Sequence, residues 1–199
     1  MGGLTFDHAG NLYGTTASGG IYNSGTVFRL VRSHGRWIET VIHNFSGGRD
    51  GAMPTGDVVV ESNGVLYGTT SAGGTKLQNG TVYKLAPSRI GWKETILHRF
   101  NGSDGYSPMG GVILDKKGVL YATTYAGGTY NAGTVFKLER SKDKWELETL
   151  YNFAGSSDGG FPVSTLLMDH SGSLYGTTLW DGDGWGWNCG DGVVFEILR

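Results

Sequence analysis

Apolar and aromatic residues fall along this chain in short runs, which are separated by clusters of Gly, Asn, Asp and Ser. In the third quarter of the sequence, four such runs cover residues 111–115, 119–124, 133–138 and 145–153. They are rich in Val, Ile, Leu, Phe, Tyr and Thr, a composition typical of β-strands bounded by turns. No segment combines a helical period with helix caps. The pattern therefore predicts antiparallel strands, here termed a, b, c and d in chain order, and almost no helix.

The runs belong to an internal repeat. The string Leu-Tyr-Gly-Thr-Thr begins at Leu12, Leu66 and Leu174, and Leu-Tyr-Ala-Thr-Thr begins at Leu120. Successive copies start 54 residues apart each time. Equal intervals with this degree of identity indicate a tandem array of one supersecondary unit.

Four antiparallel strands per repeat are typical of a β-propeller blade. One four-stranded sheet cannot bury both of its faces, whereas stacked blades bury them against one another. We predict an all-β fold, a four-bladed β-propeller whose fourth blade lacks its last strand. The predicted single domain, 1–199, has repeat units at about 1–54, 55–108, 109–162 and 163–199. A parallel-strand solenoid is the alternative, but its repeats are usually shorter.

The repeat phase leaves one sheet edge open. Residues 1–3 match residues 109–111 at the start of a strand a, and Phe195–Leu198 match a strand c. No fourth strand d follows, so strand c presents an unpaired edge. We expect a four-bladed monomer. A homodimer closed through this edge and a piece of a longer array are the alternatives.

Composition and charge limit the classes of binding partner that are expected. The 36 glycines fit a fold with many tight turns, and the 12% of aromatic residues argues against disorder. The net charge is -2 without a basic run, so neither nucleic acid nor an anionic membrane is expected as a partner. The first residues contain no charged n-region and no apolar h-region, so no signal peptide is expected. A single cysteine, Cys189, excludes an intrachain disulfide.

The motifs also resemble a known family. In the repeat, the Leu-Tyr-Gly-Thr-Thr string is followed by Gly-Gly, by Gly-Thr-Val-Phe-(Lys/Arg)-Leu, by Glu-Thr-(Val/Ile)-(Ile/Leu)-His-(Asn/Arg)-Phe, and then by Asp-Gly and Pro. Over nearly the whole chain this sequence resembles the bacterial GloVer-type tandem-repeat proteins. The resemblance implies a propeller-like β fold. Because such proteins are typically secreted or surface-anchored arrays, it also implies an extracellular or cell-surface location. It supplies no catalytic residues.

Function is expected on the loops at one end of the sheets. In an a–b–c–d meander the b–c and d–a loops share one face, and binding residues concentrate on loops that a rigid scaffold holds. The d–a loops repeat Asp-Gly at Asp50, Asp104 and Asp158. These carboxylates could surround a central opening and hold a cation or transfer protons. Alternatively, each Asp caps a turn in which Gly supplies a positive φ.

Two histidines occupy one repeat position. His43 and His98 align with Tyr151 in the third unit. Because a tyrosine replaces the histidine there, we interpret the position as one of aromatic packing. No metal site is predicted from it.

The fourth b–c loop departs from the repeat. The first three loops, 17–24, 71–79 and 125–132, have eight or nine residues, whereas the fourth covers residues 179–191. It contains three tryptophans and three aspartates, and no cation. Indole faces stack on sugar rings, and Asp and Asn side chains bond hydroxyls, so the loop predicts a saccharide ligand. The alternatives are a structural cover for the open edge and an incomplete Ca²⁺ loop that begins at Asp181 and lacks the bidentate Glu.

We therefore predict a carbohydrate- or surface-ligand-binding β-propeller with its site on the b–c/d–a loop face. The expected ligand-binding residues are Trp180, Trp185, Trp187, Asn188, Asp50 and Asp158. One alternative is a glycoside hydrolase with paired carboxylates from Asp181, Asp183 and Asp104. The other is a structural or interaction module. No cofactor is expected unless the fourth loop binds Ca²⁺.

Overall fold

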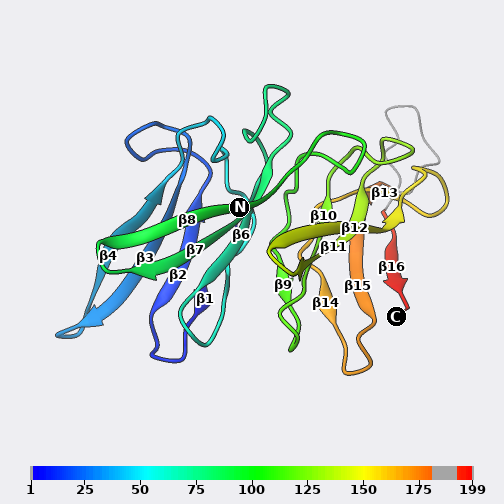
Figure 1. Cartoon of the computed structure of the whole chain (residues 1–199). Coiled ribbons are helices and arrows are strands. Elements are labelled where there is room, and N and C mark those ends of the chain that lie inside the picture. Colours follow the sequence, from blue (N-terminus) through cyan, green and yellow to red (C-terminus); the bar gives the residue numbers. More distant parts are fainter. Residues whose placement is uncertain (1, 181–191, 199) are drawn as a thin grey trace. The chain divides into compact units, whose positions relative to one another are not determined.

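The computed structural model describes residues 2–180 and 192–198, and all regular elements in this part of the chain are β-strands. The chain divides into two compact units, Met1–Arg99 and Phe100–Arg199. Each unit contains two four-stranded antiparallel sheets (Figure 1). The sequence prediction of a strand-only fold with almost no helix is confirmed for the described residues.

Unit 1 holds the first two blades as simple meanders. Their strand orders are β1-β2-β3-β4 and β5-β6-β7-β8. The strands are β1 (Thr5–Phe6), β2 (Leu12–Thr16), β3 (Thr26–Ser33), β4 (Arg36–Asn44), β5 (Val59–Val60), β6 (Leu66–Thr70), β7 (Thr81–Ser88) and β8 (Gly91–Arg99). They correspond in order to the predicted strands a, b, c and d of two repeats.

Unit 2 holds the third and fourth blades. The third is again a meander, β9-β10-β11-β12, whereas the fourth combines β14, β15 and β16 with the additional strand β13. The strands are β9 (Ile113–Leu114), β10 (Leu120–Thr124), β11 (Thr134–Ser141), β12 (Lys144–Asn152), β13 (Gly160–Pro162), β14 (Leu167–Met168), β15 (Leu174–Trp180) and β16 (Val194–Ile197). Among the described residues the fourth blade contains no strand d, as the sequence predicts.

Strand a is shorter than the sequence predicts. The expected strand over 111–115 is reduced to Ile113–Leu114, which pairs with Tyr121 and Leu120. The backbone just before it bonds to the next repeat instead: Gly111 N donates to Thr165 Oγ1 at 3.0 Å. In unit 1, Gly3 N donates to Asp57 Oδ1 at the same repeat position. Because this backbone bonds to the neighbouring blade, it does not extend the ladder of its own sheet.

The outer hairpins are long, and the same irregularity in register recurs in three of them. Strands c and d pair over the whole of β3 and β4, and the ladder shifts between Val27 and Phe28. The same shift occurs between Val82 and Tyr83 and between Val135 and Phe136. A β-bulge at a fixed position re-aims the side chains that follow it. It sets the direction of the histidine or tyrosine near the end of strand d.

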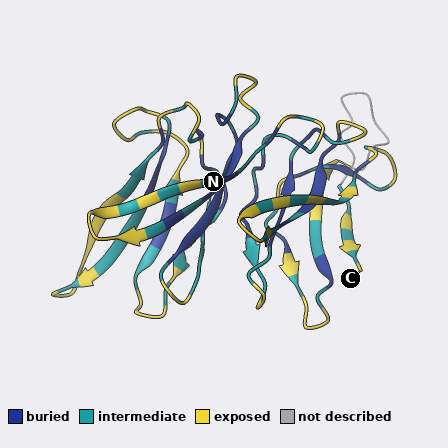
Figure 2. Cartoon of the chain, viewed as in Figure 1, coloured by how far each residue is buried: buried dark blue, intermediate teal, exposed yellow. Residues whose placement is uncertain are grey.

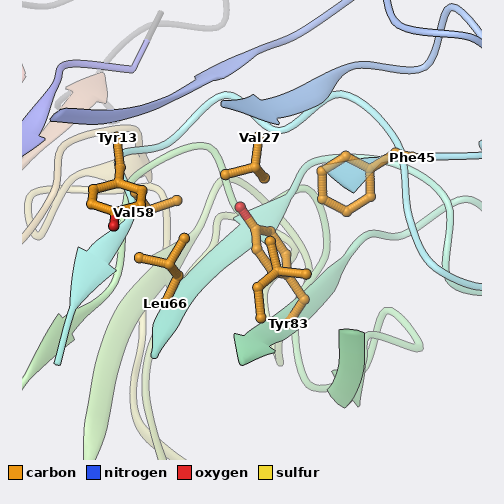
Figure 3. Packing of buried hydrophobic residues seen from close by; sticks show 7 residues of the cluster. Tyr13, Val27, Phe45, Val58, Leu66 and Tyr83 are labelled. Atoms are coloured by element: carbon orange, nitrogen blue, oxygen red, sulfur yellow. The ribbon is translucent and has the colours of Figure 1, made fainter. Parts of the chain in front are cut away.

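The core is formed by the inner strands. Every residue of β6 and β10 is buried, whereas most of β4 is exposed (Figure 2). In unit 1 the cluster of Tyr13, Val27, Phe45, Val58, Leu66, Tyr83 and Leu85 joins both blades (Figure 3). A second cluster, with Tyr121, Ala132, Val135, Phe153, Leu166 and Leu174, joins the two blades of unit 2. Stacked blades therefore bury their faces as predicted, and the all-β fold with β-propeller blades is confirmed.

The repeated tryptophans do not share one environment. Trp92 packs against the core cluster of unit 1, and its ring makes an edge contact with Tyr13 of the first blade at 6.4 Å. Trp92 therefore packs between the two blades of unit 1. Trp37, at the same repeat position in β4, is 45% exposed.

Candidate functional site

The d–a loop of one blade pairs with the start of the b–c loop in the next blade. Backbone bridges join Ala52 to Ala72 and Tyr106 to Ala126. In the fourth blade this contact becomes the strand β13, in which Gly160 pairs with Trp180. The b–c and d–a loops therefore share one face, as the meander predicts, and residues distant in sequence become neighbours there.

The residue before each d–a loop proline has an unusual backbone conformation. Met53, Ser107 and Phe161 have φ values of 54°, 54° and 58°. A positive φ at a bulky residue is unfavourable and persists only where surrounding contacts hold it. The carbonyl of Met53 accepts the Ser71 amide at 3.1 Å, and that of Ser107 accepts the Tyr125 amide at 3.1 Å. The repeat thus fixes the backbone, while the side chain at this position differs from loop to loop.

In unit 2 these loops bring three aromatic side chains together. The ring centroid of Phe161 lies 5.1 Å from that of Tyr125 and 4.9 Å from that of Trp180. Trp180 is 38% exposed, and the other two residues are partly buried. We refer to Tyr125, Phe161 and Trp180 as the aromatic row.

Each member of the aromatic row departs from the repeat. Tyr125 takes the place of Ala17 and Ser71, and Phe161 takes the place of Met53 and Ser107. Trp180 takes the place of small residues, which are Ser18, Ala72 and Ala126. The other blades fold without large aromatics here, so blade architecture does not require them.

Of the residues predicted from the fourth b–c loop, Trp180 alone lies in the described part of the chain. The sequence singled it out as a ligand-binding residue, and the structure places it in the aromatic row. Asp181, Asp183, Trp185, Trp187 and Asn188 lie outside the described residues. Tyr125 and Phe161 were not predicted. Comparing loop positions at the period of 54 residues would have revealed both as departures from the repeat.

The d–a loop aspartates bond to their own loops. Asp50 accepts the Ser46 amide at 2.7 Å, Asp104 accepts the Asn101 amide at 2.9 Å, and Asp158 accepts the Ala154 amide at 2.8 Å. The glycine after each has a positive φ, between 79° and 119°. These contacts match the turn-capping alternative. They give the three carboxylates a common structural role, whatever else each does.

Hydrogen bonding also affects the acidity of Asp158. Partial burial raises the pKa of this carboxyl, but hydrogen bonds from the Ala154 amide, the Tyr151 hydroxyl and Ser156 outweigh it and hold the pKa below its usual value. The Tyr151 hydroxyl lies 2.9 Å from Asp158 Oδ2. The residue that replaces histidine in the third repeat therefore still contacts the loop aspartate.

The equivalent pair in unit 1 belongs to a polar cluster that the sequence did not predict. His43 Nε2 lies 4.0 Å from Asp50 Oδ2 and 3.3 Å from Glu94 Oε1. Its ring also makes an edge contact with Phe45 at 4.6 Å. The interpretation of His43 as an aromatic packing residue is correct for its ring but misses its ring nitrogen. The strand position of Glu94 holds Glu39 in the first blade and Leu147 in the third, so a break in the repeat does not single it out.

The comparisons with known proteins identify a family and a fold but no activity. Residues 1–199 match the family model of the Gloeobacter/Verrucomicrobia repeat. The chain is also similar to the crystal structure of a protein of unknown function from Dyadobacter fermentans DSM 18053, with 13% identity and a TM-score of 0.55. That match covers 98% of this chain but 63% of the other, so this chain spans less than two thirds of that protein. At this identity the similarity supports the fold alone. No curated protein matches.

The described residues contain no helix of the length and hydropathy needed to cross a membrane. The family match covers every repeat unit, including the Leu-Tyr-Gly-Thr-Thr strands and the d–a loops. The chain belongs to the Gloeobacter/Verrucomicrobia repeat family, the family that its GloVer-type motifs resemble.

Proposed function

We propose that this protein is a carbohydrate-binding repeat module whose ligand stacks on the aromatic row of unit 2. The main observation is that Tyr125, Phe161 and Trp180 are aromatic at positions where other blades fold without an aromatic residue. Their three rings also lie side by side. Aromatic faces provide large, rigid apolar area for the faces of sugar rings. Three separate departures from a repeat that converge on one surface are typical of a site added to a scaffold.

The backbone beneath the row supports this assignment. Phe161 has the positive φ that all three d–a loops share, and its amide donates to Ala132 O at 2.7 Å. Its ring is therefore presented from a rigid loop, at little further entropic cost when a ligand binds. The residues directly after Trp180 add further tryptophans and carboxylates in sequence, and we expect Trp185, Trp187 and Asn188 to contribute to binding.

The test is a titration of the intact protein with a panel of oligosaccharides. Tryptophan fluorescence reports binding, and reducing-sugar release is measured in the same wells. Trp180→Ser and Phe161→Ser copy Ser18 and Ser107 of other repeats, so both variants should fold. We expect saturable binding that each variant weakens about tenfold, which corresponds to about 1.4 kcal/mol.

Met53→Ser is the matched control, because it makes a similar change at the repeat position of Phe161 but outside the aromatic row. It should leave saccharide affinity unchanged. Equal affinity in Trp180→Ser, Phe161→Ser and wild type would remove the aromatic row from the site. If the wild type bound no oligosaccharide of the panel, the proposal of a saccharide ligand would be rejected.

Sugar release in the same wells would favour the glycoside hydrolase instead. That reaction needs two carboxylates on either side of the scissile bond. Of the predicted catalytic residues, Asp104 is the one that the structure describes, and it already accepts the Asn101 amide. The binding module therefore has the stronger support.

A further inference from the structure

Three metal-ligating side chains of unit 1 converge between its two blades. His43 lies near the end of β4, Asp50 lies in the loop that follows, and Glu94 lies in β8 of the next blade. One ligand atom from each lies within 4.8 Å of the other two. All three residues are partly buried, with side-chain exposures of 17%, 20% and 18%.

Two of these atoms lack a hydrogen bond despite their proximity. His43 Nε2 and Glu94 Oε1 are 3.3 Å apart, but their geometry is not that of a hydrogen bond. Both atoms are inaccessible to solvent and have no hydrogen-bond partner in the structure. A buried polar atom without a partner costs about 1–3 kcal/mol. Two such atoms side by side indicate that they share a third group.

The tyrosine behind the cluster points to the same conclusion. Tyr83 is fully buried, and its hydroxyl also has no hydrogen-bond partner in the structure. Its side chain lies on the same face of the second blade as Glu94, because Glu94 pairs with Leu85, two residues further along β7. A third buried polar atom without a hydrogen-bond partner therefore lies on the face that carries Glu94.

The repeat shows that this polar set is not needed for folding. At the register positions of Tyr83, Glu94 and His43, the third blade has Phe136, Leu147 and Tyr151. The third blade thus has an apolar pair where the second has Tyr83 and Glu94. Its Tyr151 bonds Asp158 directly at 2.9 Å, whereas His43 leaves 4.0 Å to Asp50. His43 and Asp50 are therefore not hydrogen-bonded to each other, whereas Tyr151 and Asp158 are.

We propose that His43, Asp50 and Glu94 bind a divalent transition-metal ion of the zinc class. Ligand atoms about 2.1 Å from a tetrahedral zinc ion lie about 3.4 Å from one another, close to the separation of His43 and Glu94. An imidazole with two carboxylates suits zinc-like ions better than Ca²⁺ or Mg²⁺, which prefer oxygen ligands alone. Ser46 holds Asp50 in place by donating its amide and hydroxyl to the two carboxylate oxygens. Three protein ligands leave a fourth position for water or an exogenous ligand.

The experiment uses the intact protein after treatment with EDTA. Calorimetric titration with Zn²⁺ measures affinity and stoichiometry, and the absorption spectrum with Co²⁺ reports the coordination geometry. We expect one equivalent of Zn²⁺ to bind, and saturating Zn²⁺ to raise Tm by about 5 °C. His43→Tyr and Glu94→Leu copy the third blade and should fold. Each should weaken Zn²⁺ binding at least about tenfold and lose the Tm rise.

His98→Tyr is the matched control, because it makes the same substitution at the same repeat position one blade later. It should bind Zn²⁺ as the wild type does. Glu94→Gln, which keeps the shape of the side chain, replaces Glu94→Leu if the latter does not fold. The proposal is overturned if the wild type binds no stoichiometric Zn²⁺, or if binding survives both His43→Tyr and the Glu94 variant.

Discussion

The contact between strand b and strand c determines which side chains fit at two facing positions. Gly68 in β6 packs directly on the ring of Tyr83, and a Cβ at this position would lie 2.6 Å from Tyr83 Cζ and closer still to its hydroxyl. In the third blade the same two positions hold Ala122 and Phe136, and both are fully buried. The third blade thus accommodates a methyl group at this position.

In the first and fourth blades the residue at this position is glycine. A Cβ at Gly14 would lie 2.7 Å from Phe28 Cζ, and a Cβ at Gly176 would lie closer still to Phe195 Cζ. The hydroxyl of Tyr83 therefore adds to a clash that the ring itself also makes.

A double-mutant cycle tests the coupling between Gly68 and Tyr83. Gly68→Ala should destabilise the protein by about 2 kcal/mol, because the added methyl group overpacks a closed core. Combining it with Tyr83→Phe should recover part of that loss, since the hydroxyl is the atom nearest to the added methyl group and the pair then copies Ala122 and Phe136. Urea unfolding of the four proteins measures the interaction. Equal losses in the single and the double variant would show that the two positions are independent.

At the scale of the element, each a–b hairpin pairs a carboxylate with the tyrosine of strand b. In the first, third and fourth hairpins this carboxylate is an aspartate that also accepts turn amides, whereas in the second Asn63 accepts the equivalent amide. Asp115 accepts the amides of Lys117 and Val119 at 2.8 and 2.9 Å, and it also accepts the Tyr121 hydroxyl at 3.2 Å. Equivalent tyrosine–carboxylate pairs occur in the other three hairpins, namely Tyr13 with Asp7, Tyr67 with Glu61, and Tyr175 with Asp169. In three hairpins the aspartate therefore fixes the turn and the start of strand b together. The sequence predicts the turn but does not reveal the tyrosine contact.

These aspartate contacts predict acid sensitivity. Burial raises the pKa of Asp7, but hydrogen bonds from Asn11, Tyr13 and Ala9 outweigh it and lower the pKa below 3.8. The Ser171 hydroxyl, opposed by slight desolvation and helped by further hydrogen bonds, lowers the pKa of Asp169 as well. The folded state thus binds these protons less tightly than the unfolded chain. The carboxylates stabilise the fold above pH 3.8, and this contribution is lost as the pH falls through their folded pKa values.

We expect Tm to drop most steeply below about pH 4, as the pH falls from the unfolded pKa of these carboxyls through their lower folded pKa values. Asp7→Asn and Asp169→Asn should each flatten that drop, because the substituted group no longer titrates. Asp143→Asn, in the exposed turn between β11 and β12, is the control and should leave the slope unchanged. Thermal melts followed by circular dichroism at each pH measure the slopes. Unchanged slopes in both hairpin variants would contradict the prediction.

At the scale of the whole molecule, two hydrophobic clusters support the two units. The repeated leucine that opens strand b shows this division: Leu66 belongs to the cluster of unit 1 and Leu174 to that of unit 2, and both are fully buried. Leu12 occupies the same repeat position in the first blade but is only partly buried. One residue type at one repeat position therefore has different environments in different blades.

Replacing these leucines by alanine should destabilise the protein more where the leucine is more buried. Leu66→Ala and Leu174→Ala should each cost about 2–5 kcal/mol, whereas Leu12→Ala should cost about 1 kcal/mol. Because Leu66 and Leu174 lie in separate clusters, the cost of the double variant should equal the sum within about 0.5 kcal/mol. Urea unfolding curves measure all four values. A Leu12→Ala cost equal to that of Leu66→Ala would contradict the burial gradient.

The sequence by itself determined the fold of this protein, because its information is local and periodic. The repeat of Leu-Tyr-Gly-Thr-Thr every 54 residues fixes strand identity, order and hairpin turns. The departure at Trp180 was visible for the same reason, since any break in a strict period stands out. Strand a was overestimated because its bonds to the next blade do not appear in its own sequence.

Only the tertiary structure decided which of the candidate functional residues lie next to one another. Phe161 and Trp180 contact each other because a d–a loop pairs with the following b–c loop, and His43 meets Glu94 because two blades pack face to face. Both contacts join residues from different repeats, so no local pattern encodes them. Their distances depend on the register of the outer hairpin, its bulge and the packing of one blade on the next. These are collective properties of the folded chain, and the two proposed sites exist only through them.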